Sequence, residues 1–157
     1  MKPYYPVIRV FGVLLACFSL TMLVPWIYSY IIRDGAQSAY DEALLLSLLT
    51  GLGLWWAARH QKHELKVRDG FLLVVMVWAL LPVFASLPFI FHLHASFTDA
   101  YFEAISGLTT TGATVFSNLD TLPPSINLWR GMLVWLGGMG LIVLAVAVLP
   151  LLGIGGR

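Results

Sequence analysis

The apolar residues of this chain form long continuous runs, unlike the alternating stripes of a soluble domain. Four runs are long enough, or nearly so, to cross a bilayer as helices: residues 10–32, 43–58, 71–91 and 131–152. A helix needs about 20 residues to cross a hydrocarbon core of about 30 Å. The second run is short, and we expect it to extend by a turn at either end. The pattern predicts an all-α polytopic membrane protein.

Prolines are expected to shape three of these runs. Pro25 lies in the last third of the first run and should kink it. Pro82 and Pro88 share the third run, which predicts a bent helix or an early end. Before the last run, Pro123 and Pro124 are expected to block helix formation until residue 126.

A short segment between the third and fourth runs differs from the others. Residues 97–107 are too few to span a bilayer, and their length is typical of a re-entrant helix. Ser96 can cap the start of this helix, and Ser96-x-x-Asp99 resembles a capping box. The negative end of the helix dipole would then point toward the residues that follow. This arrangement favours a cation at that place.

The residues that follow form a run rich in hydroxyl groups and glycine, Ser-Gly-Leu-Thr-Thr-Thr-Gly-Ala-Thr, at 106–114. Threonines lose rotamer freedom in a helix, and Gly112 permits a positive φ. In a membrane, extended backbone is tolerated only where it is buried in protein or lines water. Rows of carbonyls facing such a space replace the hydration shell of potassium in filters. The run predicts a cation filter; the alternative is a loop that merely joins two helices.

Glycines also cluster in the last run. Gly137, Gly138 and Gly140 place three small residues in one turn, which invites another helix backbone to approach closely. We therefore expect these glycines to act in helix packing.

Composition excludes most other classes of function. Hydrophobic residues make up 59% of the 157 residues and charged residues 11%, against roughly 25% charged in soluble domains. A chain of this length leaves no room for a sizeable soluble catalytic module. No span carries an acid, a histidine or a base in its middle third, and no basic neighbour activates the threonines. We expect neither an enzyme nor a cofactor, and the net charge of +1 gives no indication of nucleic acid binding.

Charged residues predict the orientation of the spans. Seven lysines and arginines fall on one side of the predicted membrane, and only Arg33 and Arg130 fall on the other. This asymmetry places both termini and the middle loop in the cytoplasm. Glu103 is either part of an acidic mouth that concentrates cations or a rim or structural carboxylate. The six acids expected on the outer side are Asp34, Asp41, Glu42, Asp99, Glu103 and Asp120.

Three stretches carry a resemblance to a known family: FEAISGLTTTGAT at 102–114, LVWLGGMG at 133–140 and VLAVAVLP at 143–150. They closely resemble the TrkH/TrkG membrane subunit of bacterial Trk potassium-uptake systems, a relative of the KtrB and HKT transporters. The resemblance spans residues 102–156. The two preceding spans fit the additional helical hairpin that TrkH-type members carry before their first pore repeat.

The resemblance implies potassium uptake across the bacterial inner membrane. It assigns K⁺ binding to the backbone carbonyls of Thr110, Thr111 and Gly112, with Thr109, Ala113 and Thr114 shaping the loop. It also implies two units. Residues 1–65 would form the hairpin, and residues 66–157 would form the first pore repeat, with its filter at 108–115.

Family members carry four pore repeats on one chain, form homodimers and bind a cytoplasmic nucleotide-binding subunit, TrkA. This chain has one repeat and stops at residue 157. The simplest explanation is an N-terminal fragment of a longer transporter, completed by the remaining repeats and surrounded by lipid. Two alternatives stay open: a channel of four identical copies, and a membrane scaffold or regulatory fragment that does not transport.

Overall fold

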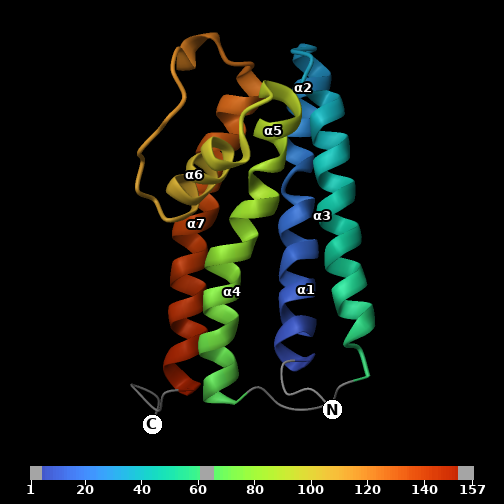
Figure 1. The fold of residues 1–157 in the computed structure, drawn as a ribbon, viewed down its shortest axis with the longest axis vertical. Coiled ribbons are helices and arrows are strands. Elements are labelled where there is room, and N and C mark those ends of the chain that lie inside the picture. Colours follow the sequence, from blue (N-terminus) through green and yellow to red (C-terminus); the bar gives the residue numbers. More distant parts are fainter. Residues whose placement is uncertain (1–4, 61–65, 152–157) are drawn as a thin grey trace.

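The computed structural model describes residues 5–60 and 66–151, and within these ranges all regular structure is helical. Long helices lie side by side, and a short helix and an irregular loop occupy one end of the bundle (Figure 1). This confirms the all-α fold class. The elements are α1 (Tyr5–Leu20), α2 (Leu23–Ile32), α3 (Gln37–Ala57), α4 (Val67–Ala85), α5 (Leu87–Leu93), α6 (Phe97–Leu108), the 3₁₀ helix η1 (Leu119–Thr121) and α7 (Pro124–Leu151).

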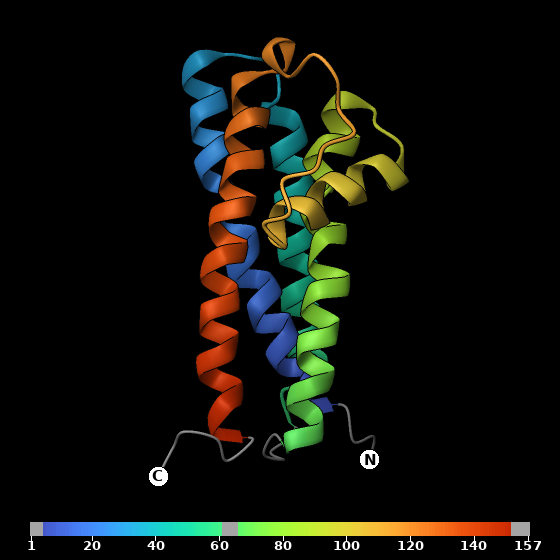
Figure 2. The ribbon, with the colours of Figure 1, turned by 90° about the vertical axis from the view of Figure 1, so that its left-hand side faces the viewer.

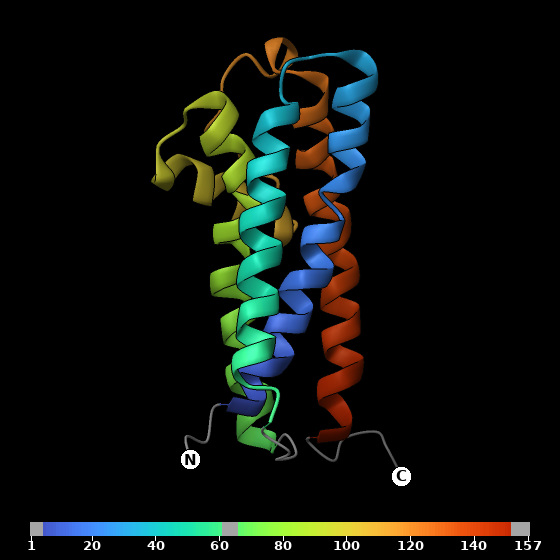
Figure 3. The same cartoon turned by 90° about the vertical axis from the view of Figure 1, so that its right-hand side faces the viewer.

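Among the described residues, three stretches are long and apolar enough to cross a membrane: Pro6–Ile32, Val67–Leu93 and Pro124–Val143. The predicted second span corresponds to α3, which is 21 residues long but is not among these three stretches, so its crossing of a membrane stays a prediction. It starts six residues before the predicted 43 and ends one residue before the predicted 58, so it gains length at its N-terminal end only. Figure 3 shows α3 running beside α1 and α2 in the opposite direction.

The first span is broken between α1 and α2, one turn before Pro25. The backbone N–H groups of Thr21 and Met22 donate to the carbonyls three residues earlier, Phe18 and Ser19, at 3.0 and 3.1 Å. A proline ring clashes with the carbonyl four residues before it and offers no N–H to that carbonyl. The expected kink therefore falls at residues 21 and 22, ahead of the proline that causes it.

The third span is broken at Ser86, which separates α4 from α5. Pro82 lies inside α4, and Pro88 lies in the first turn of α5. The indole Nε1 of Trp129, on α7, donates to the carbonyl of Ala85 at 2.9 Å, and Trp129 is fully buried. A side chain from another helix thus satisfies a carbonyl at the break and ties the bent span to α7.

The last helix begins earlier than the sequence pattern indicated. Pro124 is its first residue, so the prediction that the proline pair blocks helix formation until residue 126 is wrong. Proline suits the first helical position, where no N–H is needed and its fixed φ is already helical. The carbonyl of Pro123 accepts the first bonds, from the N–H groups of Ile126 and Asn127 at 2.9 and 3.2 Å. The predicted end at residue 152 lies outside the described residues.

One core joins the two units implied by the family resemblance. Tyr40 of α3 is fully buried, and its hydroxyl donates to the carbonyl of Ser125, on α7, at 2.9 Å. The division at residue 65 falls in a stretch outside the described residues and stays a prediction. The largest fully buried side chains of this core are Trp129, Tyr40, Phe89, Met22, Ile126 and Leu133.

Asp34, in the loop between α2 and α3, links the hairpin to the first turn of α7. Its Oδ1 accepts bonds from the Ser29 hydroxyl and the Ala36 N–H, and its Oδ2 accepts the Ser125 N–H at 2.9 Å. That N–H is one of the donors that a helix leaves free in its first turn. Partial burial raises the pKa of Asp34, but interactions with Ser125, Ser29 and the Ala36 N–H outweigh it, so the pKa lies below 3.8.

This lowered pKa predicts a pH-dependent stability. A carboxyl whose folded pKa is depressed stabilises the fold above the unfolded pKa of about 3.9, and this contribution is lost as the pH falls through the folded pKa. We expect the unfolding temperature of the detergent-solubilised chain to drop as the pH falls below the unfolded pKa of about 3.9, and Asp34→Asn to reduce that drop. Asp120→Asn, at an exposed acid, is the control. Parallel pH curves for the chain and Asp34→Asn would contradict the prediction.

Candidate functional site

The short helix α6 carries the candidate site at its C-terminal end. Ser96 caps its start, with Oγ accepting the N–H of Asp99 at 3.2 Å, as the sequence predicted. The helix enters the bundle from the end that also holds the α2–α3 loop, and the chain after it returns to the same end (Figure 2). Its last residue is Leu108, so the loop begins at Thr109.

The backbone φ angles of this loop alternate in sign over residues 110–112. Thr110 has a φ of 58° and Gly112 a φ of 82°, whereas Thr111 between them does not have a positive φ. Gly112 was expected to permit such a conformation, but Thr110 was not. A left-handed conformation costs a residue with a Cβ roughly 1–2 kcal/mol, and strain of this kind clusters at functional sites.

The peptide groups of the loop are oriented by Ser106. The N–H groups of Thr111 and Gly112 both donate to the Ser106 carbonyl, at 2.9 and 3.4 Å. Peptide groups are planar and trans here, so the carbonyls of Thr110 and Thr111 point the opposite way, away from α6. Within the described part of the chain, no donor bonds to the carbonyl oxygens of Thr110, Thr111 or Gly112, and all three residues are exposed. They form a row of unpaired acceptors.

The next carbonyl, that of Ala113, faces the other way. The Ser106 hydroxyl donates to it at 2.6 Å, so it points toward α6. Ahead of the row, the Thr109 hydroxyl lies 2.7 Å from that of Thr111 and donates to the Ile105 carbonyl at 2.6 Å. Ser106 therefore limits the row of free carbonyls at its outer end, a role that the sequence analysis missed.

Glu103 binds the last part of the loop, residues 114–116. Its Oε1 accepts the Thr114 hydroxyl and the N–H groups of Val115 and Phe116, the last two at 2.6 and 3.1 Å. Its Oε2 lies 3.4 Å from Nε of Arg130. Glu103 is only 5% exposed. Of the two interpretations from sequence, the structure supports the structural carboxylate, and membership of an open acidic mouth is wrong for this residue.

The helix α7 contacts the end of α6 backbone to backbone. A Cβ placed on Gly137 would lie 1.9 Å from the carbonyl oxygen of Leu108. On Gly138 it would meet only the Thr110 methyl group, at 3.8 Å, and on Gly140 nothing within 4 Å. Of the three glycines that the sequence assigned to helix packing, Gly137 alone makes a close approach. Gly107 was not anticipated, and its Cβ would lie 3.0 Å from that of Leu133.

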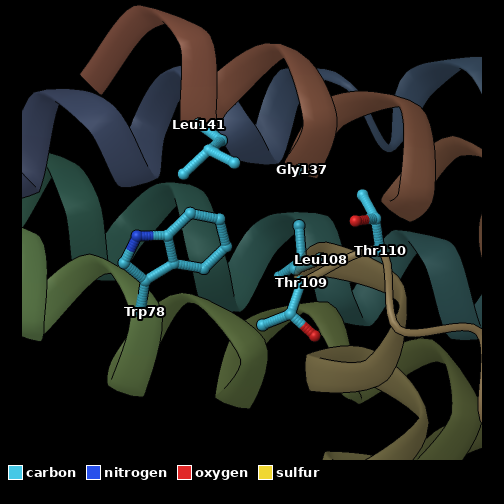
Figure 4. A pocket seen from close by; sticks show the side chains of 6 residues that line it. All are labelled: Trp78, Leu108, Thr109, Thr110, Gly137 and Leu141. Atoms are coloured by element: carbon cyan, nitrogen blue, oxygen red, sulfur yellow. The ribbon is translucent and has the colours of Figure 1, made fainter. Parts of the chain in front are cut away.

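A cavity of about 210 Å³ lies beside the start of the loop. Figure 4 shows the Trp78 indole and the Leu141 side chain on one side of it and the threonines on the other. Among the described residues, no group of three or more histidine, cysteine or acidic side chains is arranged to hold a metal ion. The lining residues are Trp78, Leu108, Thr109, Thr110, Gly137 and Leu141.

Comparison with known proteins identifies the family. Residues 37–157 match the TrkH family, described as a cation transport protein. The chain belongs to the TrkH family. This confirms the resemblance read from residues 102–156.

Curated relatives of this TrkH-family chain are named as Trk system potassium uptake proteins. It is 51% identical over 150 residues to the Trk system potassium uptake protein TrkH of Escherichia coli K12, covering 94% of the chain and 31% of the relative. It is 40% identical over 147 residues to TrkG of the same strain, covering 92% of the chain and 30% of the relative. The chain spans about a third of the length of the curated relatives it matches.

A solved structure agrees with the fold. The crystal structure of the potassium transporter TrkH from Vibrio parahaemolyticus superposes with a TM-score of 0.90 at 49% identity. The match covers 99% of this chain and 34% of that one. The helices described above are therefore those of a TrkH-family member.

The contact between Gly137 and Leu108 generates a prediction for this TrkH-family chain. Gly137→Ala should lower the unfolding temperature in detergent, because its Cβ overlaps backbone atoms and overpacking costs about 1–3 kcal/mol. Gly140→Ala, in the same helix with open space, should be neutral or slightly stabilising. Tryptophan fluorescence during heating measures both variants. Equal unfolding temperatures would show that α7 does not press on α6 at Gly137.

Proposed function

We propose that this chain forms one pore repeat of a potassium-uptake protein and supplies one of four filter loops. The observation that carries the proposal is the row of unpaired, exposed carbonyls at Thr110, Thr111 and Gly112. Potassium filters bind the ion with such carbonyls in place of water. Thr109, Ala113 and Thr114 shape the loop around that row. The named relatives are potassium uptake proteins, which supports K⁺ as the ion.

A single loop surrounds an ion on one side only. The proposal therefore needs the remaining pore repeats of the same transporter to complete the filter. The relatives are about three times as long as the matched segment, which leaves length for such repeats. The exposed apolar side chains along α7, including Trp135 at 62% and Ile142 at 66% exposed, suit a contact with further repeats or with lipid.

The proposed setting is the bacterial inner membrane, with both termini in the cytoplasm. Lysines and arginines gather on the side assigned to the cytoplasm. The first turns of α1 and α4 and the last turns of α3 and α7 lie at one end of the bundle, and the α2–α3 loop lies at the other (Figure 1). By resemblance, the hairpin at 1–65 precedes the repeat at 66–157, the transporter is a homodimer and a TrkA-type nucleotide-binding subunit regulates it. The proposal includes neither enzymatic activity nor an organic cofactor.

The proposal is tested in a chimera in which this chain replaces the matching segment of the E. coli TrkH relative. We expect the chimera to restore growth at low K⁺ and Rb⁺ uptake in a strain deficient in potassium uptake. Gly112→Ala should reduce uptake or the preference for K⁺ over Na⁺ about tenfold, since a left-handed alanine costs about 1–2 kcal/mol. Its Cβ would meet nothing within 4 Å, so the defect would come from backbone conformation.

Gly131→Ala is the matched control. It also adds a Cβ in open space, but in helical backbone of α7, and should leave uptake unchanged. A chimera that reaches the membrane without restoring uptake would favour the non-transporting scaffold. Wild-type uptake and selectivity in Gly112→Ala would contradict the assignment of this loop to the filter.

A further inference from the structure

Glu103 is a buried charge beside the loop to which the proposed function gives no task. Its side chain is 3% exposed, and its charged partner is Arg130, whose side chain is 24% exposed. Burying a carboxylate is costly unless it is paired and hydrogen-bonded, and this one is both. An apolar side chain of similar size would avoid that cost. The position of the charge therefore calls for an explanation in terms of what it holds.

We infer that Glu103 is a positioning residue for ion selection: its carboxylate fixes residues 114–116 and thereby the arrangement of the carbonyls at Thr110, Thr111 and Gly112. The inference rests on the proposed function. It assigns Glu103 no contact with the ion.

The first argument is the number of groups that one oxygen orients. The N–H groups of Val115 and Phe116 both point to Glu103 Oε1, at 2.6 and 3.1 Å. Because the peptide groups are planar and trans, the carbonyls of Thr114 and Val115 are turned away from α6. Hydrogen bonds to a charged group are roughly twice as strong as those between neutral groups. One charged oxygen thus sets the direction of two successive peptide groups.

The second argument is the space behind the loop. A cavity of about 40 Å³ separates α6 and α7 from the back of the loop, and Glu103, Ser106, Gly112, Ala113 and Arg130 line it. Side chains do not fill this space, so packing alone does not fix the distance between the loop and α6. The hydrogen bonds from the loop to Glu103 and Ser106 fix this distance instead. If the charge of Glu103 is removed, the loop has room to shift.

The third argument is the placement of the countercharge. Nε of Arg130 lies 3.4 Å from Glu103 Oε2, and its Nη1 lies 3.4 Å from Oδ1 of Asn127, one turn earlier on α7. Arg130 thus occupies the oxygen that the loop does not use. The carboxylate still presents Oε1 to the loop, so one side chain links α6, α7 and residues 114–116.

The test uses the chimera described above and measures Rb⁺ uptake, its inhibition by Na⁺, and the KM and maximal rate for K⁺. Glu103→Gln keeps the size of the side chain but removes its charge. We expect it to lower the preference for K⁺ over Na⁺ about tenfold, with KM rising more than the maximal rate falls. Glu103→Asp keeps the charge on a shorter stem and should give an intermediate loss.

Two controls separate positioning from stability. Asp99→Asn makes the same chemical change at an exposed site on the same helix and should leave selectivity unchanged. Asp34→Asn should weaken the fold away from the loop and keep the wild-type preference for K⁺. A loss of selectivity in the Glu103 variants beyond that of Asp34→Asn supports the inference.

The outcomes distinguish the inference from the proposed function. Wild-type selectivity in Glu103→Gln, with a loss in Gly112→Ala, overturns the inference and leaves the proposed function in place. Wild-type selectivity in both variants overturns the proposed function as well. Should Glu103→Gln fail to accumulate in the membrane, Glu103→Asp decides, because an unchanged preference in that variant also overturns the inference.

Discussion

The backbone N–H groups of an extended loop need acceptors, and this requirement governs the candidate site. The short helix α6 supplies them from its last two turns. The Ser106 carbonyl takes the N–H groups of Thr111 and Gly112, and Glu103 takes those of Val115 and Phe116. With these four donors bound on the inner side, the loop presents the carbonyls of Thr110 and Thr111 on the other. In a membrane, unsatisfied backbone groups are costly, so carbonyls left free in this way are expected to face water or an ion.

The remainder of the bundle keeps α6 and α7 in register. Asp34 binds the first turn of α7 from the hairpin, and Trp129 binds the break in the third span from α7. Gly12 and Gly51 let α1 and α3 meet backbone to backbone, since a Cβ on Gly12 would lie 2.7 Å from the Gly51 carbonyl oxygen. The hairpin is therefore packed and hydrogen-bonded against the helix that follows the loop.

The features that could be predicted from sequence are those that depend on neighbouring residues. The all-helical class follows from long apolar runs, the start of α6 from the Ser96 cap, and the positive φ from Gly112. The helical start at Pro124 was also available, from the preference of proline for the first helical position.

The features that were missed depend on contacts between distant residues. The loop groups that Glu103 binds lie 11 to 13 residues along the chain, and Arg130 lies 27 residues away. No local pattern indicates that Ser106 would bind two loop N–H groups with its carbonyl and the Ala113 carbonyl with its hydroxyl. Nor does any local pattern indicate that Thr110 would adopt a left-handed conformation. Which of Gly137 and Gly140 meets α6 depends on the rotation of α7 about its axis, which is set by the whole bundle.

The meeting of Gly137 with Leu108 has a mechanical consequence. Most helices touch through side chains, which change rotamer and so absorb small displacements. Here the backbone of α7 lies against the terminal carbonyl of α6, with no side chain between them to deform. A shift of α7 toward α6 at this level therefore displaces the end of α6, because no side chain between them can give way. Since the carbonyl row starts two residues after Leu108, the position of that row depends directly on where α7 lies.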